Sequence, residues 1–241
     1  MLDFNEIPRK DRVIVAMDCD VVEARNLGNS LADAASWVKI GMTLYYAVGP
    51  GIVAEMKERG FKVFLDLKFF DIPHQVEGAA YSAAMSGADM LTMHTMGGID
   101  MMRAAQRGVQ RAAEKTGGDV PITLGITVLT SMNDETLAQM GVANPMRDQV
   151  KMLAGLTQEA GISGVVCSAQ ESTMLREVLG PQAYIVTPGI RPKGAEIGDQ
   201  SRVTTPAEAF ANGSSHIVVG RPITQASDPR EAFLKIAEEL A

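Results

Sequence analysis

Residues 62–73, KVFLDLKFFDIP, place charged side chains at the end of an apolar strand. Side chains alternate between the two faces of a strand, so Asp66 and Lys68 are expected to point the same way. Ionisable groups on the inner face of an otherwise apolar strand are costly unless they are paired or functional. The stretch therefore predicts a strand whose carboxyl end opens onto a polar site.

On both sides of this stretch, short apolar runs alternate with segments of helical period, which is typical of a parallel sheet wrapped by helices. Eight strands are predicted, at residues 12–18, 36–41, 62–69, 90–94, 122–130, 164–168, 183–188 and 216–220. Amphipathic helices are predicted at residues 51–59, 101–115, 146–160 and 229–240. The longest connection, residues 131–163, should hold two helices separated at Asn144-Pro145. The pattern favours an α/β fold, a single-domain (β/α)8 TIM barrel over residues 1–241.

The composition excludes several classes of function. The formal net charge is -7 and no run of Lys or Arg suggests a surface for nucleic acid or anionic lipid. The first residues lack the pattern of a secretory signal, and no apolar run is long enough to cross a bilayer. Cys19 and Cys167 lie far apart and outside any CxxC spacing, so neither a disulfide framework nor a zinc site is expected. We therefore expect a cytoplasmic protein that binds neither nucleic acid nor membrane.

Polar residues gather at the predicted strand ends, where the active site of an α/β barrel forms. Asp18 ends the first strand and Lys39 lies in the second. With Asp66 and Lys68 they would form an alternating array of carboxylates and ammonium groups. Such an array keeps a lysine charged and in place, which suits delivery of a proton to a developing carbanion. Each residue alone is equally compatible with a structural ion pair or a solvated loop, but the four together favour a catalytic site.

The segment DLKFFDIP, residues 66–73, resembles the signature of the orotidine 5'-monophosphate decarboxylase family. Its DxKxxD core is shared with sugar-phosphate decarboxylases and hexulose-phosphate synthases of the same barrel superfamily. The resemblance covers essentially the whole chain in order and spacing. It includes Asp18, Lys39 in VKIG, Thr130 in VLTS, PGIRP at residues 188–192, Gln200 and VGRPI at residues 219–223.

The resemblance implies decarboxylation of orotidine 5'-monophosphate to uridine 5'-monophosphate and CO2, the final step of de novo pyrimidine nucleotide synthesis, without metal or cofactor. Lys68 would protonate C6 of the pyrimidine, with Asp66 beside the substrate carboxylate. Asp18 and Lys39 would complete the charge array and contact the ribose. Asp71 would reach into the site of a partner subunit, so the resemblance implies a C2 homodimer with composite sites.

A phosphate site is expected from both the barrel and the resemblance. The loops after the seventh and eighth strands commonly bind phosphate in this fold. Arg221, with its neighbour Gly220, and Arg191 are the expected anion ligands there, and Gln200 would bridge phosphate and base. The remaining residues predicted to bind substrate are Ile72, Gln75, Thr130 and Pro188.

Some positions depart from the family pattern. Phe70 stands where the family commonly has His, and His74 and Gln75 replace Asn-Thr. Whether Gln75 substitutes for the usual Thr hydroxyl across the dimer interface stays open. His94 is expected to be a core residue or a buttress of the lysine array. His216 is expected at the opposite, stability end of the barrel.

Two other functions also stay open. A metal-dependent sugar-phosphate decarboxylase or aldolase would carry an acidic metal ligand near the second strand end, where this chain has Lys39. The second alternative is a non-catalytic barrel that binds a nucleotide as a sensor or scaffold. In such a protein some charged residues of the array would be expected to be replaced, yet all of them are present.

Overall fold

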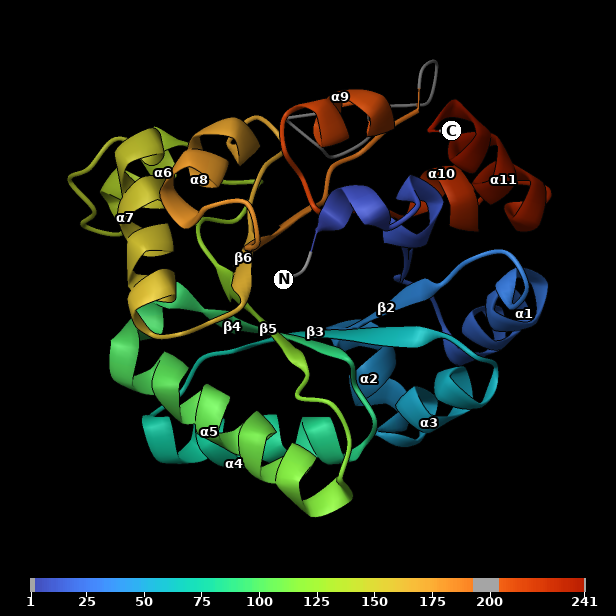
Figure 1. The fold of residues 1–241 in the computed structure, drawn as a ribbon, viewed down its shortest axis with the longest axis horizontal. Helices are drawn as coiled ribbons and strands as arrows, with labels where there is room; N and C mark the ends of the chain where they lie inside the picture. The colour runs from blue at the N-terminus through green and yellow to red at the C-terminus, as the bar shows by residue number, and fades with distance from the viewer. Residues whose placement is uncertain (1–2, 193–203, 241) are drawn as a thin grey trace.

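The computed structural model describes residues 3–192 and 204–240, and within them eight parallel strands close into a barrel (Figure 1). The predicted (β/α)8 architecture is confirmed. Each strand pairs with the next in chain order, and β1 pairs with β8 to close the ring. The strands are β1 (Val13–Met17), β2 (Trp37–Gly41), β3 (Lys62–Phe69), β4 (Met90–His94), β5 (Ile122–Ile126), β6 (Gly164–Val166), β7 (Tyr184–Thr187) and β8 (His216–Val219).

Helices surround the strands and bury their outward-facing side chains in the largest hydrophobic core (Figure 1). The α-helices are α1 (Val21–Leu31), α2 (Met42–Val48), α3 (Gly51–Glu58), α4 (Pro73–Met85), α5 (Gly98–Thr116), α6 (Asp134–Gln139), α7 (Met146–Glu159), α8 (Ser172–Leu179), α9 (Pro206–Ala211), α10 (Arg221–Thr224) and α11 (Pro229–Glu239). The 3-10 helices are η1 (Phe4–Glu6), η2 (Arg9–Arg12) and η3 (Thr95–Gly97). Of the helices in the described ranges, none has the length and apolar character needed to cross a bilayer.

The inside of the barrel is filled by side chains from alternate strand positions, as the period of two in a strand requires. The buried set is Ile14, Ala16, Trp37, Phe64, Met90, Leu124, Val186 and Val218. Toward the carboxyl ends, the same period brings Lys39, Asp66 and Thr92 to the inside, and all three are buried. The barrel therefore has an apolar floor beneath a polar mouth.

The amino ends of the strands are closed by aromatic rings. His216, at the start of β8, stacks on Tyr184 with ring centroids 5.6 Å apart and lies edge-on to Trp37 at 5.9 Å. Phe4 of η1 packs edge-on to Tyr184 at 5.1 Å, which brings the N-terminal segment across this end (Figure 1). His216 lies opposite the polar mouth, as predicted.

Two predicted strands were too long at their carboxyl ends by more than one residue. β5 ends at Ile126 rather than Thr130. Ile126 pairs with Val166, which is the last residue of β6, so the residues after Ile126 have no strand partner in β6. β6 ends at Val166 rather than Ser168 because a turn follows, in which the carboxylate of Glu171 accepts the backbone N–H of Ser168. The residues after both strands form loops at the mouth.

The connection between β5 and β6 holds two helices, as predicted. The side chain of Asn133 accepts the backbone N–H of Thr136 and caps the start of α6. Pro145 directly precedes α7, where its missing N–H costs no helical hydrogen bond.

Candidate active site

A cavity of about 470 Å³ opens at the carboxyl ends of the strands. This volume lies in the usual range of small-molecule sites. The predicted site residues that line it are Asp18, Lys39, Asp66, Lys68, Thr130, Pro188, Arg191, Gly220 and Arg221. Residues from both ends of the chain therefore meet in one cavity.

The predicted charge array forms on β1, β2 and β3. The ammonium nitrogen of Lys39 lies 2.9 Å from Asp18 Oδ1 and 3.6 Å from Asp66 Oδ2. The ammonium nitrogen of Lys68 lies 2.9 Å from both carboxylate oxygens of Asp66. Charges thus alternate in the order Asp18, Lys39, Asp66, Lys68, with Asp66 shared between two lysines.

The backbone at Lys68 leaves the regular strand geometry on which the prediction rested. Lys68 has a φ of 53°, alone among the non-glycine residues that the structure describes. The pairing register of β3 with β4 shifts between Leu65 and Phe69 at this point. Such a conformation is costly for a long side chain and persists only where the surroundings hold it. Asp66 and Lys68 do meet, but through this irregular backbone within β3 and not through simple alternation.

Asp66 is an ionised carboxylate held in a nearly closed position, with a side chain that is 12% exposed. Burial alone would raise its pKa. The charges of Lys39 and Lys68, with hydrogen bonds from Lys68 and Thr92, outweigh burial and lower the pKa of Asp66 below its ordinary value. The site therefore keeps a negative charge between its two ammonium groups.

Thr92 was missed at the sequence level, although its inward position on β4 was a usable signal. Its hydroxyl donates to Asp66 Oδ1 at 2.9 Å and accepts the backbone N–H of Lys68 at 2.9 Å. His94, two residues further, is partly buried, and its ring lies 5.5 Å from that of Phe70. Burial, and then the charge of Lys68, lowers the pKa of His94. A neutral imidazole beside Lys68 adds no competing positive charge.

Gly41 is a second residue that the sequence reading missed. It ends β2, and a Cβ atom there would lie 2.9 Å from Asp18 Oδ1 and 3.3 Å from the ammonium nitrogen of Lys39. The shorter distance is closer than real Cβ contacts allow. Glycine at this position therefore leaves room for the Asp18–Lys39 pair.

The two predicted anion ligands lie on the side of the cavity formed by β7 and β8. Arg191 is 7% exposed, and its guanidinium donates to the carbonyl of Ile190 at 2.9 Å. Arg221 begins α10 directly after Gly220, which follows β8. Both arginines line the cavity. Gln200 lies outside the described residues.

Asp71, Ile72 and Gln75 are exposed and do not line the cavity. They follow β3 on the rim of the mouth, where the Asp71 carboxylate accepts the backbone N–H of Ile72. The same rim carries exposed apolar side chains after β2, β3 and β4, which are neighbours in the barrel. The exposed fractions of these residues are 44% for Met42, 62% for Phe70, 64% for Ile72 and 44% for Met96.

Cys19 lines the cavity and was not predicted to do so. Burial, followed by the charges of neighbouring carboxylates, raises its pKa to about 12. The thiol therefore stays protonated and is a poor nucleophile. In the part of the chain that the structure describes, no group of three or more His, Cys, Asp or Glu side chains could hold a metal ion.

Comparison with known proteins agrees with this geometry. The sequence model of a family described as "Orotidine 5'-phosphate decarboxylase / HUMPS family" matches residues 11–236. The chain is 44% identical to an orotidine 5'-phosphate decarboxylase of Moorella thermoacetica, over 96% of this chain and 92% of that one. It is 46% identical to the enzyme of the same name from Actinobacillus succinogenes, over 95% and 98%. A crystal structure of orotidine 5'-phosphate decarboxylase from Lactobacillus acidophilus superposes with a TM-score of 0.85 at 38% identity, covering 95% of this chain and 99% of that one.

Proposed function

Because this chain belongs to the orotidine 5'-phosphate decarboxylase / HUMPS family, we propose that it converts orotidine 5'-monophosphate to uridine 5'-monophosphate and CO2 in the cavity at the barrel mouth. This reaction is the last step of pyrimidine nucleotide synthesis. The observation that carries the proposal is the buried Asp66 carboxylate between the ammonium groups of Lys39 and Lys68. One barrel domain over residues 1–241 would supply every residue of a site except those that a partner subunit contributes.

Lys68 is the acid of the proposed mechanism. The bond between C6 and the carboxylate carbon breaks, CO2 leaves, and the electron pair remains on C6. Lys68 gives C6 a proton from its ammonium group and afterwards regains a proton from solvent. Its contact with both oxygens of Asp66 fixes the position of the donor.

Asp66 has a second effect on the bound substrate. Its lowered pKa keeps it negative, so it repels a substrate carboxylate placed beside Lys68. This repulsion disappears when neutral CO2 leaves, whereas the attraction of Lys68 for negative charge at C6 grows. Both changes favour the transition state over the bound substrate.

The remaining predicted residues would contact the ribose, the phosphate and the base of the substrate. Asp18 and Lys39 would hold the ribose, since their ion pair lies at the cavity wall formed by β1 and β2. Arg191 and Arg221 would bind the phosphate from the opposite side, with Gly220 beside Arg221, and the resemblance gives Gln200 the role of bridging phosphate and base. Thr130 and Pro188 would contact the base or ribose from the loops after β5 and β7.

Lys39 separates this proposal from a metal-dependent sugar-phosphate enzyme. Its ammonium nitrogen lies between carboxylate oxygens of Asp18 and Asp66, at 2.9 and 3.6 Å, where a divalent cation would otherwise neutralise them. A fixed lysine in that position supports a reaction that needs neither a metal nor another cofactor. The near-full-length relatives named orotidine 5'-phosphate decarboxylase favour the same conclusion.

A homodimer with composite sites is part of the proposal. The exposed apolar rim of Met42, Phe70, Ile72 and Met96 borders the cavity mouth, and such a rim is costly to leave in water. Asp71 lies on this rim, does not line the cavity of its own chain, and accepts the backbone N–H of Ile72. Pairing two rims about a twofold axis would bring Asp71, Ile72 and Gln75 of each subunit to the other's site. A cytoplasmic location is also proposed, supported by the two free cysteines.

The proposed function is tested with purified protein, orotidine 5'-monophosphate and excess EDTA, by following the loss of substrate absorbance. Conversion to uridine 5'-monophosphate is expected. A parallel assay offers a sugar phosphate with Mg²⁺. Reaction in the second assay alone would favour the metal-dependent enzyme, and no reaction in either would favour a non-catalytic binding protein.

A further inference from the structure

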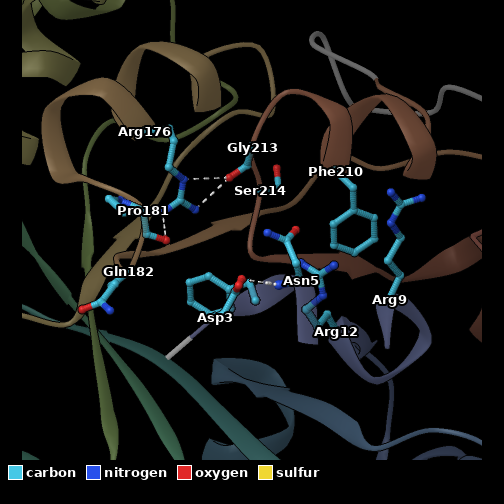
Figure 2. A pocket seen from close by; sticks show the side chains of 11 residues that line it. Asp3, Asn5, Arg9, Arg12, Arg176, Pro181, Gln182, Phe210, Gly213 and Ser214 are labelled. Atoms are coloured by element: carbon cyan, nitrogen blue, oxygen red, sulfur yellow. Dashed lines mark hydrogen bonds between the residues drawn. The ribbon is translucent and has the colours of Figure 1, made fainter. Parts of the chain in front are cut away.

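A second cavity lies at the opposite end of the barrel from the proposed active site, and its volume is about 530 Å³ (Figure 2). Its walls come from η1 and η2, from α8 and the turn between α8 and β7, and from α9 and the segment between α9 and β8. This volume suits a small metabolite. The decarboxylation uses none of the residues that line it.

The lining of this second cavity is positively charged. Arg9, Arg12 and Arg176 contribute three positive charges and Asp3 one negative charge, a balance of 3 − 1 = +2. The whole chain has a net charge of -7. Within the described ranges, no ion pair joins any of the three arginines to a carboxylate. A concentration of unpaired guanidinium groups in an acidic protein favours an anionic ligand.

Arg12 is the most constrained of the three arginines. Its residue is 6% exposed, one terminal nitrogen donates to the carbonyl of Ser215 at 3.2 Å, and its guanidinium lies 4.6 Å from the centre of the Phe210 ring. Its Nε atom is buried and has no hydrogen-bond partner. Native structures rarely leave such a donor unsatisfied. Burial, and then the charge of Arg9, lowers the pKa of Arg12.

The other two arginines differ in freedom. Arg176 donates to the carbonyls of Gly213, Gly180, Pro181 and Ala183, so its position is fixed and it stiffens one wall. Arg9 is exposed on η2, and the exposed Asn5 of η1 also lines the cavity. Figure 2 shows Arg9 and Arg12 on the side of Phe210, with Arg176 on the opposite wall. The cavity thus combines fixed walls with side chains that can adjust to a ligand.

We infer that this second cavity binds a phosphate monoester of a small organic molecule, with the phosphate between Arg9 and Arg12 and the organic group against Phe210 and Phe4. A phosphate monoester carries a charge of about −1.5 to −2 at neutral pH, which matches the net charge of the lining. Guanidinium groups bind phosphate through paired N–H donors. The two rings offer apolar surface beside the arginines. This site lies beyond the decarboxylation and does not depend on it.

The test uses phenyl phosphate as the probe, titrated calorimetrically into the full-length protein and into an Arg221→Ala variant, which lacks an arginine of the catalytic cavity but keeps the whole lining of the second cavity. One site per chain that persists in Arg221→Ala is expected. Arg9→Ala should weaken binding about tenfold or more, because it removes a charged donor to the phosphate. Lys10→Ala is the matched control: Lys10 is exposed on the same short helix but does not line the cavity, and this variant should change the affinity by less than about twofold.

Inorganic phosphate provides a second arm. It should compete with phenyl phosphate but bind more weakly, because it lacks the group that contacts the rings. Equal affinities would overturn the assignment of an organic ester. No binding of millimolar phenyl phosphate, or equal losses in Arg9→Ala and Lys10→Ala, would overturn the site itself. Both positions are exposed, so neither variant threatens folding, and comparing them identifies the site whether or not phenyl phosphate also enters the catalytic cavity.

Discussion

The backbone N–H of Lys68 donates to the hydroxyl oxygen of Thr92 at 2.9 Å, across the junction of β3 and β4. The same hydroxyl donates to Asp66, so one side chain supports both the unusual backbone of Lys68 and the carboxylate beside it. Thr92→Val keeps the shape and removes both hydrogen bonds. We expect kcat for decarboxylation to fall about tenfold and the free energy of unfolding to fall by about 1–3 kcal/mol.

Steady-state kinetics and urea unfolding measure the two effects of Thr92→Val. Thr92→Ser, which retains the hydroxyl, should restore most of kcat. Wild-type kcat in Thr92→Val would show that the contact does not position Lys68.

Gly41→Ala should disturb substrate binding without unfolding the barrel. The new methyl group would lie 2.9 Å from Asp18 Oδ1, so the exposed Asp18 side chain must move away from Lys39. We expect KM for orotidine 5'-monophosphate to rise about tenfold, the size of one lost charged contact. Gly155→Ala, in open space on α7, is the matched control and should leave KM unchanged. Equal KM values in both variants would show that Asp18 does not bind the ribose.

His216 should make stability depend on pH. Burial, and then the charges of Arg12 and Lys62, lowers its pKa from 6.5 to about 3. As pH falls below 6.5, the unfolded chain gains a proton at His216 that the folded chain refuses until about pH 3. Stability is therefore full above pH 6.5 and is lost toward pH 3, by about 2 kcal/mol between pH 7 and pH 5 from this residue.

Urea unfolding at pH 7 and pH 5 measures this loss. His216→Phe, which keeps a ring in the aromatic cluster, should reduce the difference between the two pH values by about that amount. His74→Gln, at an exposed position, should leave the difference as it is in the wild type. An unchanged difference in His216→Phe would mean that His216 titrates normally.

Mixing two inactive variants tests the composite site. Lys68→Ala and Asp71→Asn damage the same site from different subunits if Asp71 acts across the interface. In an equal mixture of exchanged subunits, half of the dimers are mixed and each holds one intact site of two, so about one quarter of wild-type activity should return. Activity that stays at the level of the separate variants would place Asp71 and Lys68 in the site of one chain.

The barrel and the charge array were predictable because they follow from periods that the sequence displays. Apolar runs alternate with amphipathic segments, and the polar residues that end those runs must meet where parallel strands end. Strand ends were less predictable, since β5 stops where β6 offers no further partner. That limit depends on register between strands and is not visible in either segment alone.

The backbone conformation of Lys68 and the roles of Thr92 and Gly41 were missed because they depend on contacts between strands. The positive φ of Lys68 interrupts the alternation from which its direction was predicted. Thr92 gains its role from the neighbour that β4 places beside β3, and Gly41 from the closeness of Asp18. The role of Asp71 across a subunit interface, which the resemblance implies, stays a prediction. The second cavity was also missed, because Arg12 had been placed in a strand and instead ends η2.

The most direct measurement of the central claim is kcat/KM for orotidine 5'-monophosphate in excess EDTA, for the wild type and Lys68→Ala. The Lys68 side chain lies at the mouth and is 26% exposed, so its truncation should leave the circular dichroism spectrum and the Tm close to those of the wild type. We predict rapid conversion by the wild type and a loss of at least about 10²- to 10⁴-fold in Lys68→Ala, the range for removal of a general acid. A folded Lys68→Ala protein with near-wild-type kcat/KM would contradict the mechanism.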